Sequence, residues 1–394
     1  MAGIIITIVL SLCLGIPVWW TGVPLGNPMP FEAVMIATSI LMLSVALVGP
    51  IRIAKGVSRA QFKEMPHALK LFRRDKRSRL GIWWTCIFIV LSFFGAILLQ
   101  NFPSGLSWIL PLWIILFGVT FDVLRAALRR LIRYTSCPFL LKRATHYFRK
   151  ALKKCHEDAA IDWVKSVTEA LEKATKRSRL HCAECSLTTI ETMVEGYVND
   201  ASQRAAKNPS SEQPSLLDRV NHLSMLVCKR LKWTYMTAMR EHVDPIAFDI
   251  ISSFGKISLV LSRQHPLLAN IPLACIIKCM KAVEPHQCPQ CVDTWGMSIH
   301  ATRTLSEACK AFIRISTEKN ASYKELIRNT LIDLGDLVKS AYEKRYVTNP
   351  ALLMQSFTEI GDLLEASAYK NCPDREIILG ELRRLMAESG LPSS

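Results

Sequence analysis

Four long apolar runs lie within the first 125 residues, and they constrain the fold of this chain more than any other feature. Their only charged residues, Glu32 and Asp122, lie next to the ends of the runs. A helix needs about 20 apolar residues to cross a bilayer. One such run could be a buried helix of a soluble core, but four runs this close together predict four transmembrane helices, paired as two hairpins. The runs cover residues 4–20, 31–48, 80–99 and 106–123.

The Lys and Arg residues are concentrated beside these runs. The whole chain has a formal net charge of +16. Residues 51–154 contain twenty Lys and Arg residues against three acidic ones, whereas residues 155–394 contain 29 of each kind. A nucleic-acid-binding protein would carry its positive charge on the soluble fold. Because that part of the chain is neutral, nucleic acid is not an expected partner.

The same distribution predicts the orientation of the chain in the membrane. Segments 51–79 and 124–154 each hold ten Lys and Arg residues, and the loops at 21–30 and 100–105 hold none. Since Lys and Arg are retained on the cytoplasmic side, we expect an integral, multi-pass membrane protein with both termini in the cytoplasm, in the inner or plasma membrane if the source is bacterial. The predicted organisation is a first transmembrane hairpin (1–50), a basic cytoplasmic loop (51–79), a second transmembrane hairpin (80–123), a basic amphipathic juxtamembrane segment (124–154) and a cytoplasmic helical domain (155–394).

Basic residues next to the predicted spans are candidate lipid-contact residues. Four arginines of the juxtamembrane segment repeat at the i, i+4, i+5 and i+8 spacing of one helix face, namely Arg125, Arg129, Arg130 and Arg133. A second basic cluster precedes the third run and comprises Arg73, Arg74, Lys76 and Arg77. Cations at a membrane surface each add about 1 kcal/mol of attraction to anionic headgroups. The lipid bilayer with its anionic headgroups is therefore an expected partner, although orientation alone would require the same composition.

Residues 155–394 show the period of amphipathic helices and no alternating strand pattern. In residues 159–174, for example, Ile161, Val164, Val167 and Leu171 fall on one face. The fold class is therefore expected to be all-α, with four transmembrane helices followed by a multi-helix cytoplasmic domain. Further helices are predicted near residues 186–205, 215–241, 246–263, 269–283, 296–316, 322–344, 350–369 and 374–389.

Glycines recur inside these predicted helices. Gly255, Gly296, Gly335 and Gly361 each follow a large apolar residue, at spacings of 41, 39 and 26 residues. A glycine inside a helix costs about 1 kcal/mol relative to alanine, so its recurrence indicates close contact between neighbouring helices. Two-helix units of about 40 residues stack in α-solenoids. The spacing favours an α-solenoid-like stack of helical pairs, with a plain helical bundle as the alternative.

Two Cys-x-x-Cys pairs form the candidate metal site. Cys182 and Cys185 make the first pair, Cys288 and Cys291 make the second, and 102 residues lie between the pairs. Two intervening residues let both thiolates of a pair reach one ion, and two pairs can complete a tetrahedral zinc site. Zinc is therefore a candidate cofactor. The alternatives are a redox dithiol at the second pair and ordinary buried or loop cysteines.

No catalytic residue is predicted, because the sequence contains no Walker loop, no Gly-x-Gly-x-x-Gly, no Gly-x-Ser-x-Gly and no His-Glu-x-x-His motif. The chain is expected to be a membrane-anchored interaction or scaffold protein whose helical domain binds a protein partner. The alternatives are a subunit of a channel or transporter regulated by that domain, a membrane-associated metal- or thiol-dependent protein, and a membrane enzyme acting on lipid. Transport is disfavoured because the apolar runs hold no ionisable residue in their interior.

Overall fold

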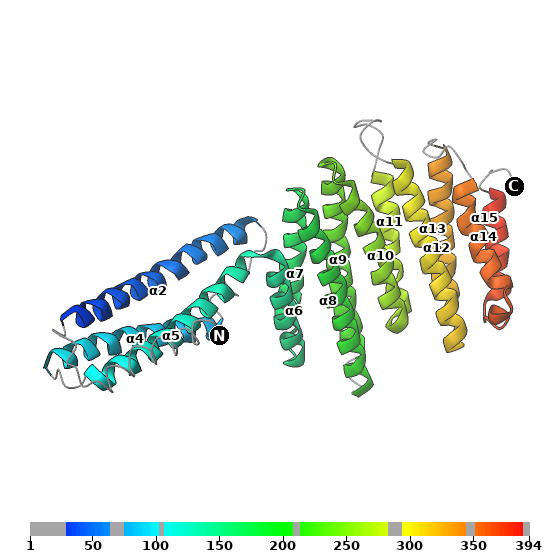
Figure 1. Cartoon of the computed structure of the whole chain (residues 1–394). Coiled ribbons are helices and arrows are strands. Elements are labelled where there is room, and N and C mark those ends of the chain that lie inside the picture. The colour runs from blue at the N-terminus through cyan, green and yellow to red at the C-terminus, as the bar shows by residue number, and fades with distance from the viewer. Residues whose placement is uncertain are drawn as a thin grey trace. The chain divides into compact units, whose positions relative to one another are not determined.

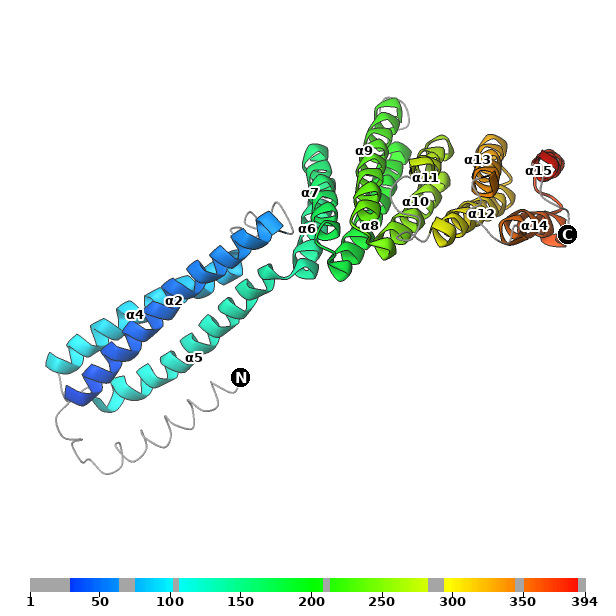
Figure 2. The same cartoon turned by 90° about the horizontal axis from the view of Figure 1, so that it is seen from above.

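The computed structural model describes residues 29–63, 75–101, 106–207, 213–282, 294–343 and 351–388 (Figures 1 and 2). The chain divides into two compact units, Met1–Leu140 and Leu141–Ser394. All regular secondary structure within the described ranges is helical. The all-α prediction is therefore confirmed for this part of the chain.

Three long helices build the first unit: α2 (Met29–Lys63), α4 (Lys76–Asn101) and α5 (Leu106–Ile132), followed by the 3₁₀ turn η2 (Arg133–Thr135). Each helix packs against the other two. Their buried centre contains Met42, Ala46, Ile89 and Leu124. Gly81 lets α4 approach α5 closely, since a Cβ at this position would lie 2.9 Å from the Ala127 Cβ.

The surface of this unit is unusually apolar for a helix bundle. Leu41, Val90 and Phe94 are each more than 60% exposed. Soluble proteins expose single apolar residues, but contiguous apolar faces of this kind mark sites that contact a partner or a membrane. The further large apolar side chains exposed on these helices are Ile36, Ile40, Val45, Leu47, Val48, Ile51, Leu80, Trp83, Trp84, Ile87, Leu91, Phe93, Ile97, Leu98, Leu112, Ile115, Phe121 and Ile132.

Three helices within the described ranges are long and apolar enough to cross a membrane. Two of these segments, Met35–Gly56 in α2 and Lys76–Leu98 in α4, coincide with the second and third predicted spans. The third segment, Asp244–Gln264, belongs to the second unit, and 61% of its apolar window is buried there, as expected of a core helix. The fourth predicted span forms α5, which is not among the three, and the first lies outside the described residues. Four transmembrane helices are therefore not confirmed.

Two predicted segment boundaries differ from the boundaries of the helices. α2 continues through Pro50 to Lys63, so the start of the predicted basic loop is helical. In the predicted juxtamembrane segment, α5 ends at Ile132 and α6 (Cys137–Lys153) follows as a separate helix. One face of α6 is buried through Leu140, Leu141, Ala144 and Phe148. This helix therefore packs into the fold along its apolar face.

The second unit is a succession of helices that stand side by side in chain order (Figure 1). Nine helices were predicted from the sequence between residues 159 and 389, and α7 to α15 occupy these positions. Short 3₁₀ turns follow α10 and α14, at Pro266–Leu268 and Ser367–Tyr369. The helices are α7 (Glu157–Thr175), α8 (Leu180–Lys207), α9 (Gln213–Arg240), α10 (Asp244–Gln264), α11 (Asn270–Ala282), α12 (Thr294–Lys319), α13 (Lys324–Glu343), α14 (Ala351–Glu365) and α15 (Arg375–Glu388).

These helices form two layers. In one layer α8, α10, α12 and α14 pack in sequence, and in the other α7, α9, α11, α13 and α15 do the same. α6 begins the array: its Tyr147 ring stacks on Trp163 of α7 at a centroid distance of 5.7 Å. The substantial packing contacts join helices no more than two positions apart along the chain. This arrangement is a repeat-like helical stack, as the glycine spacing indicated.

Four of the hairpins turn in the same way. Cys155, Ser178, His242 and Asn320 follow α6, α7, α9 and α12, and each has a positive φ between 45° and 56°. In each case the next residue donates its backbone N–H to the carbonyl five residues earlier, as from Arg179 to Ala174. This is the Schellman ending of a helix, in which glycine is the preferred left-handed residue. None of the four positions holds glycine.

Three glycines inside helices lie where two packed helices come close together, as expected. A Cβ at Gly255 in α10 would lie 2.7 Å from Thr304 Cγ2 in α12. At Gly335 and Gly361 the nearest atoms would belong to Leu385 and Leu382 of α15, at 3.1 and 3.4 Å. Gly296 differs because it lies in the first turn of α12 rather than in a helix interior.

Candidate membrane-surface site

The predicted arginine face exists on α5, but its members have different surroundings. Arg125, Arg129 and Arg133 are exposed. Arg130 is only partly exposed, and its Nε donates a hydrogen bond to Asp75 Oδ2 at 2.7 Å. Arg130 is thus an internal link between α5 and the residue that precedes α4.

Asp75 is the buried acceptor of this link. Its side chain is 4% exposed and also accepts a hydrogen bond of 2.9 Å from Ser78 Oγ. Burial acts to raise the pKa of Asp75, but the hydrogen bonds from Arg130 and Ser78 and the charge of Arg130 outweigh it and lower the pKa below its usual value. The carboxylate is therefore charged at neutral pH and ties the start of α4 to the end of α5.

A cavity of about 870 Å³ lies between α4 and α5 beside this link. Five arginines line it, together with two tryptophans and several small or aliphatic side chains. Its lining residues from α4 are Arg77, Leu80, Gly81, Trp83, Trp84 and Ile87, and those from α5 are Asp122, Val123, Arg125, Ala126, Ala127, Arg129 and Arg130, with Arg133 following in η2. All four arginines of the predicted helix face, and Arg77 of the second cluster, thus line one cavity.

The remaining members of the second basic cluster lie apart from the cavity lining or beyond the described residues. Lys76 is the exposed first residue of α4. Arg73 and Arg74 fall in residues 64–74, outside the described part of the chain. Their predicted contact with the membrane surface stays a prediction.

Only the first Cys-x-x-Cys pair falls within the described residues. Cys182 and Cys185 lie in the first turns of α8 and are partly exposed, and the Cys185 Sγ is 3.8 Å from the His181 Nε2. Burial, aided by the charges of Cys182 and Glu184, raises the pKa of the Cys185 thiol. Cys288 and Cys291 lie in the undescribed residues 283–293. No group of three or more metal-ligating side chains occurs among the described residues, and the shared zinc site stays a prediction.

A different group of cysteines, which the sequence spacing did not reveal, lies between α9 and α11. Cys228 and Cys279 are buried, and Cys275 is partly exposed. A hydrogen bond between the Cys228 and Cys275 thiols, together with burial, raises the pKa of Cys228. The same hydrogen bond, helped by Lys278 and Lys232, lowers the pKa of Cys275. The i, i+4 spacing of Cys275 and Cys279 was visible in the sequence, but Cys228 is 47 residues away.

A serine and a histidine form a second contact that was not predicted. Ser252 Oγ of α10 lies 2.8 Å from His300 Nε2 of α12. The His300 ring also packs edge-on against Phe248 at a centroid distance of 5.2 Å. Burial lowers the pKa of His300, which keeps the imidazole neutral at pH 7. This pair joins two helices of the same layer.

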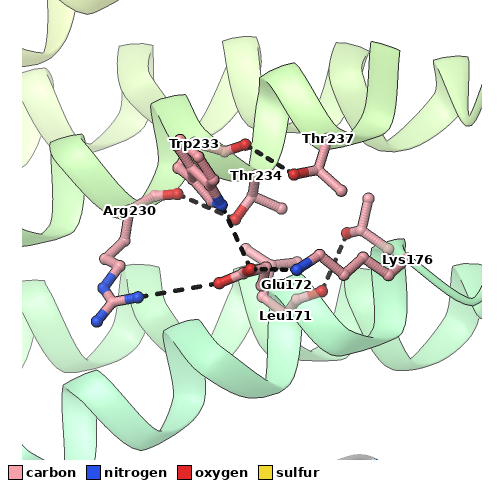
Figure 3. A network of polar contacts seen from close by, with 8 residues as sticks. Leu171, Glu172, Lys176, Arg230, Trp233, Thr234 and Thr237 are labelled. Atoms are coloured by element: carbon pink, nitrogen blue, oxygen red, sulfur yellow. Dashed lines mark hydrogen bonds and ion pairs between the residues drawn. The ribbon is translucent and has the colours of Figure 1, made fainter. Parts of the chain in front are cut away.

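A polar network between α7 and α9 surrounds Glu172 of α7 (Figure 3). Its Oε1 accepts hydrogen bonds from Lys176 Nζ at 2.7 Å and from Trp233 Nε1 at 3.3 Å. Its other oxygen lies 3.9 Å from Arg230. Burial acts to raise the pKa of Glu172, but these three partners lower it. The network fixes the orientation of Trp233, a side chain that is 56% exposed.

No protein-family model matches this chain, and no curated protein matches it either. Among solved structures, one match is a "Circular tandem repeat protein with novel repeat topology and enhanced subunit contact surfaces". It is 14% identical, the alignment covers 97% of this chain and 90% of that chain, and the TM-score is 0.39. A TM-score this low does not establish a shared fold. The architecture of this chain therefore rests on its own helix contacts.

Proposed function

We propose that this protein is anchored in a membrane by its first unit and binds a protein partner through its second unit, on the cytoplasmic side. The observation that carries the anchor is the outward-facing apolar surface of α2 and α4, where Leu41, Val90 and Phe94 are exposed. In water, this surface would cost about 25 cal/mol for each Å² left exposed. In a bilayer, the same side chains contact acyl chains.

Three serines in the apolar parts of α2 and α4 have their hydroxyl groups satisfied within the unit, as a bilayer requires. Ser39, Ser44 and Ser92 each bond to the backbone carbonyl four residues earlier, at 2.6–2.9 Å. Ser92 Oγ also accepts the Trp113 Nε1 hydrogen at 2.8 Å. These hydroxyls serve helix packing in the proposed anchor, which favours an anchor over a solute path.

A membrane-extraction experiment tests the anchor. The full chain should stay with the membrane pellet after alkaline carbonate treatment and leave it only with detergent. Val90→Asp with Phe94→Asp should release a large part of the protein, because a charge near the bilayer centre costs about 3 kcal/mol. Leu267→Asp with Ile377→Asp, at two exposed apolar positions of the second unit, is the matched control and should leave extraction unchanged. Extraction of the unmodified chain by carbonate alone would refute the anchor.

The partner surface is proposed on the outward stripe of α9, which contains Met225, Lys229, Trp233 and Arg240 at helical spacing. Exposed tryptophans and arginines carry much of the binding energy at protein interfaces. Trp233 is held in place by Glu172, so little side-chain entropy is lost on binding. This fixed, exposed indole supports the stripe as the docking position.

A crosslinking comparison tests this surface in the membrane of the native host. A photoreactive residue at Met236, next to Trp233, should give a discrete crosslinked product that the Trp233→Ala variant loses. The same photoreactive residue at Leu267, which is exposed elsewhere on the unit, should not give this product. A product that persists in Trp233→Ala, or the lack of any product from Met236, would contradict the proposed surface.

A further inference from the structure

The cavity between α4 and α5 changes character along its length. The two helices run antiparallel, and three contacts fix their register: Arg130 with Asp75 at 2.7 Å, Gly81 with Ala127, and Trp84 Nε1 with Thr120 Oγ1 at 3.2 Å. Four of the five arginines therefore lie toward the end where Arg130 meets Asp75, and Arg125 lies about one turn further along α5. We call this the guanidinium end, and it comprises Arg77, Arg125, Arg129, Arg130 and Arg133.

Apart from Asp122, the other end of the cavity is apolar and leads toward the membrane-spanning part of the helices. We call it the apolar wall, and it comprises Leu80, Trp83, Trp84, Ile87, Val123, Ala126 and Ala127. Leu80 and Trp83 are each more than two-thirds exposed, so the wall opens to the surroundings of the helices. Tryptophan at this depth is typical of the headgroup level of a bilayer. The cavity thus has the polarity of a phospholipid, charged at one end and apolar at the other.

The guanidinium end carries an excess of positive charge. Asp75 neutralises Arg130. Within the described ranges, Arg77, Arg125, Arg129 and Arg133 form no ion pair of their own, and Asp122 is the one further acidic side chain of the lining. Guanidinium groups bind phosphate oxygens through two parallel hydrogen bonds. Several of them around one opening form a site for phosphate rather than for a neutral headgroup.

The volume of the cavity is that of a site for one bound ligand. Ligand cavities in proteins span about 300–1,000 Å³, and the 870 Å³ here accommodates a phosphate headgroup with the first part of its acyl chains. Gly81 brings the two sides of the cavity close together, since a Cβ at this position would lie 2.9 Å from the Ala127 Cβ.

We propose that this cavity binds one anionic phospholipid molecule, with its phosphate at Arg125, Arg129 and Arg133 and its acyl chains along Leu80 and Trp83. The inference rests on the proposed function, since the apolar wall contacts acyl chains only if α4 and α5 lie in a bilayer. It goes beyond general attraction to a negative surface, because it assigns one lipid to one place and predicts a stoichiometry of one per chain.

Lipid retention in native mass spectrometry tests the site. The full chain is reconstituted in nanodiscs of phosphatidylcholine with one-tenth phosphatidylglycerol, released in a mild detergent and weighed with its bound lipids. The unmodified chain should keep one phosphatidylglycerol, preferred about thirtyfold over phosphatidylcholine, as an interaction with two cations at about 1 kcal/mol each implies. The triple variant Arg125→Gln, Arg129→Gln and Arg133→Gln should lose this preference.

A matched control removes the same charge away from the cavity. Lys142, Arg149 and Lys150 are exposed on α6 and do not line the cavity, so their replacement by Gln should leave one phosphatidylglycerol bound. The variant Ala126→Trp fills the apolar wall without changing charge and should also lose the lipid. Equal retention in the cavity variants and the unmodified chain would overturn the site, as would equal loss in the α6 control.

Two further outcomes separate the site from its alternatives and from the anchor. Release of the bound phosphatidylglycerol by millimolar inorganic phosphate would show a phosphate site with no role for the acyl chains and would overturn the lipid assignment. If the chain fails to enter nanodiscs at all, the anchor itself is wrong, and the lipid site falls with it. Entry into nanodiscs without enrichment of phosphatidylglycerol leaves the anchor intact and refutes only the lipid site.

Discussion

The close approach of α10 and α12 at Gly255 allows a quantitative test of the helical stack. Gly255→Ala places a Cβ 2.7 Å from Thr304 Cγ2, whereas ordinary contacts between such atoms lie at 3.4–4 Å. Thr304 cannot rotate away without loss, because its Oγ1 donates a 2.9 Å hydrogen bond to the His300 carbonyl. Overpacking of this kind costs about 1–3 kcal/mol, and the helix propensity of alanine offsets about 1 kcal/mol of it. We expect a net destabilisation of about 1 kcal/mol.

The sign of the effect should reverse when the Thr304 methyl group is removed. Thr304 Cγ2 is the one atom that a Cβ at Gly255 would meet within 4 Å. In a Thr304→Ser background, Gly255→Ala should therefore stabilise by about 0.5–1 kcal/mol, the gain in helix propensity. The coupling between the two substitutions should be about 2 kcal/mol. Gly380→Ala in α15 is the control, since nothing lies within 4 Å of its Cβ position, and it should stabilise in either background.

Hydrogen exchange across a urea series, followed by mass spectrometry of peptides from α10 and α12, measures these local free energies in the full chain. A local readout is appropriate because a stack of repeats need not unfold in one step. If Gly255→Ala stabilises α10 as much as Gly380→Ala stabilises α15, the close contact is absent. If it destabilises equally with threonine and with serine at position 304, the methyl group is not its cause.

Four other measurements address further features. Asp75→Asn should destabilise the α4–α5 pair by about 2 kcal/mol at pH 7. Because the pKa of Asp75 is lowered in the folded state, this difference should fade as the pH falls from the usual value of 3.8 through the lowered one. Hydrogen exchange at pH 7 and in this acidic range checks it. Burial raises the pKa of Asp333 to about 6, so the charged carboxylate destabilises the fold once the pH has risen through this value. Asp333→Asn should therefore stabilise α13 by about 2 kcal/mol at pH 7.5 but not at pH 4. Ser178→Gly should stabilise the α7–α8 turn by about 1 kcal/mol, because Ser178 has a φ of 50°. Asn320→Gly should stabilise its turn less, since asparagine tolerates this conformation, and thermal unfolding of the two variants compares the gains. Elemental analysis of the protein purified without chelators should give one zinc per chain, lost in Cys182→Ser with Cys185→Ser, if the shared zinc site exists; a stoichiometry near zero would refute it.

The helices of the second unit could be predicted closely because their signals are local. The apolar period of α10 predicted residues 246–263, and the helix occupies Asp244–Gln264. Prolines and turn residues marked the ends, as at Pro266, where the 3₁₀ turn begins. α14 was predicted to reach residue 369 but ends at Glu365, because the 3₁₀ turn Ser367–Tyr369 continues the helical period without continuing the helix.

The basic composition of residues 124–154 concealed the packing of the helix within them. Basic residues dominate residues 124–154, and this segment was predicted as one juxtamembrane stretch ending at 154. Within this stretch, Leu140 ends the first compact unit and Leu141 begins the second. The buried residues of α6, including Leu140, Ala144 and Phe148, place this helix in the fold. Its density of Lys and Arg obscured that apolar face.

The candidate site shows the same division between local and distant signals. The spacing of Arg125, Arg129 and Arg133 revealed a helix face, and these side chains do line one cavity. The separate role of Arg130 depends on Asp75, which is 55 residues away. No local pattern reveals a contact across such a distance. The cluster of Cys228 with Cys275 was missed for the same reason.

The contacts of the second unit, which join helices no more than two positions apart, have a mechanical consequence. Such an array behaves as springs in series, since no contact between its distant parts braces it. A small rotation at each interface adds to the next, so a pull on α15 would be shared among all the interfaces back to α6. The close contacts at Gly255 and Gly335 would be the stiffest links, and replacing either glycine should alter how far the array extends under a given force.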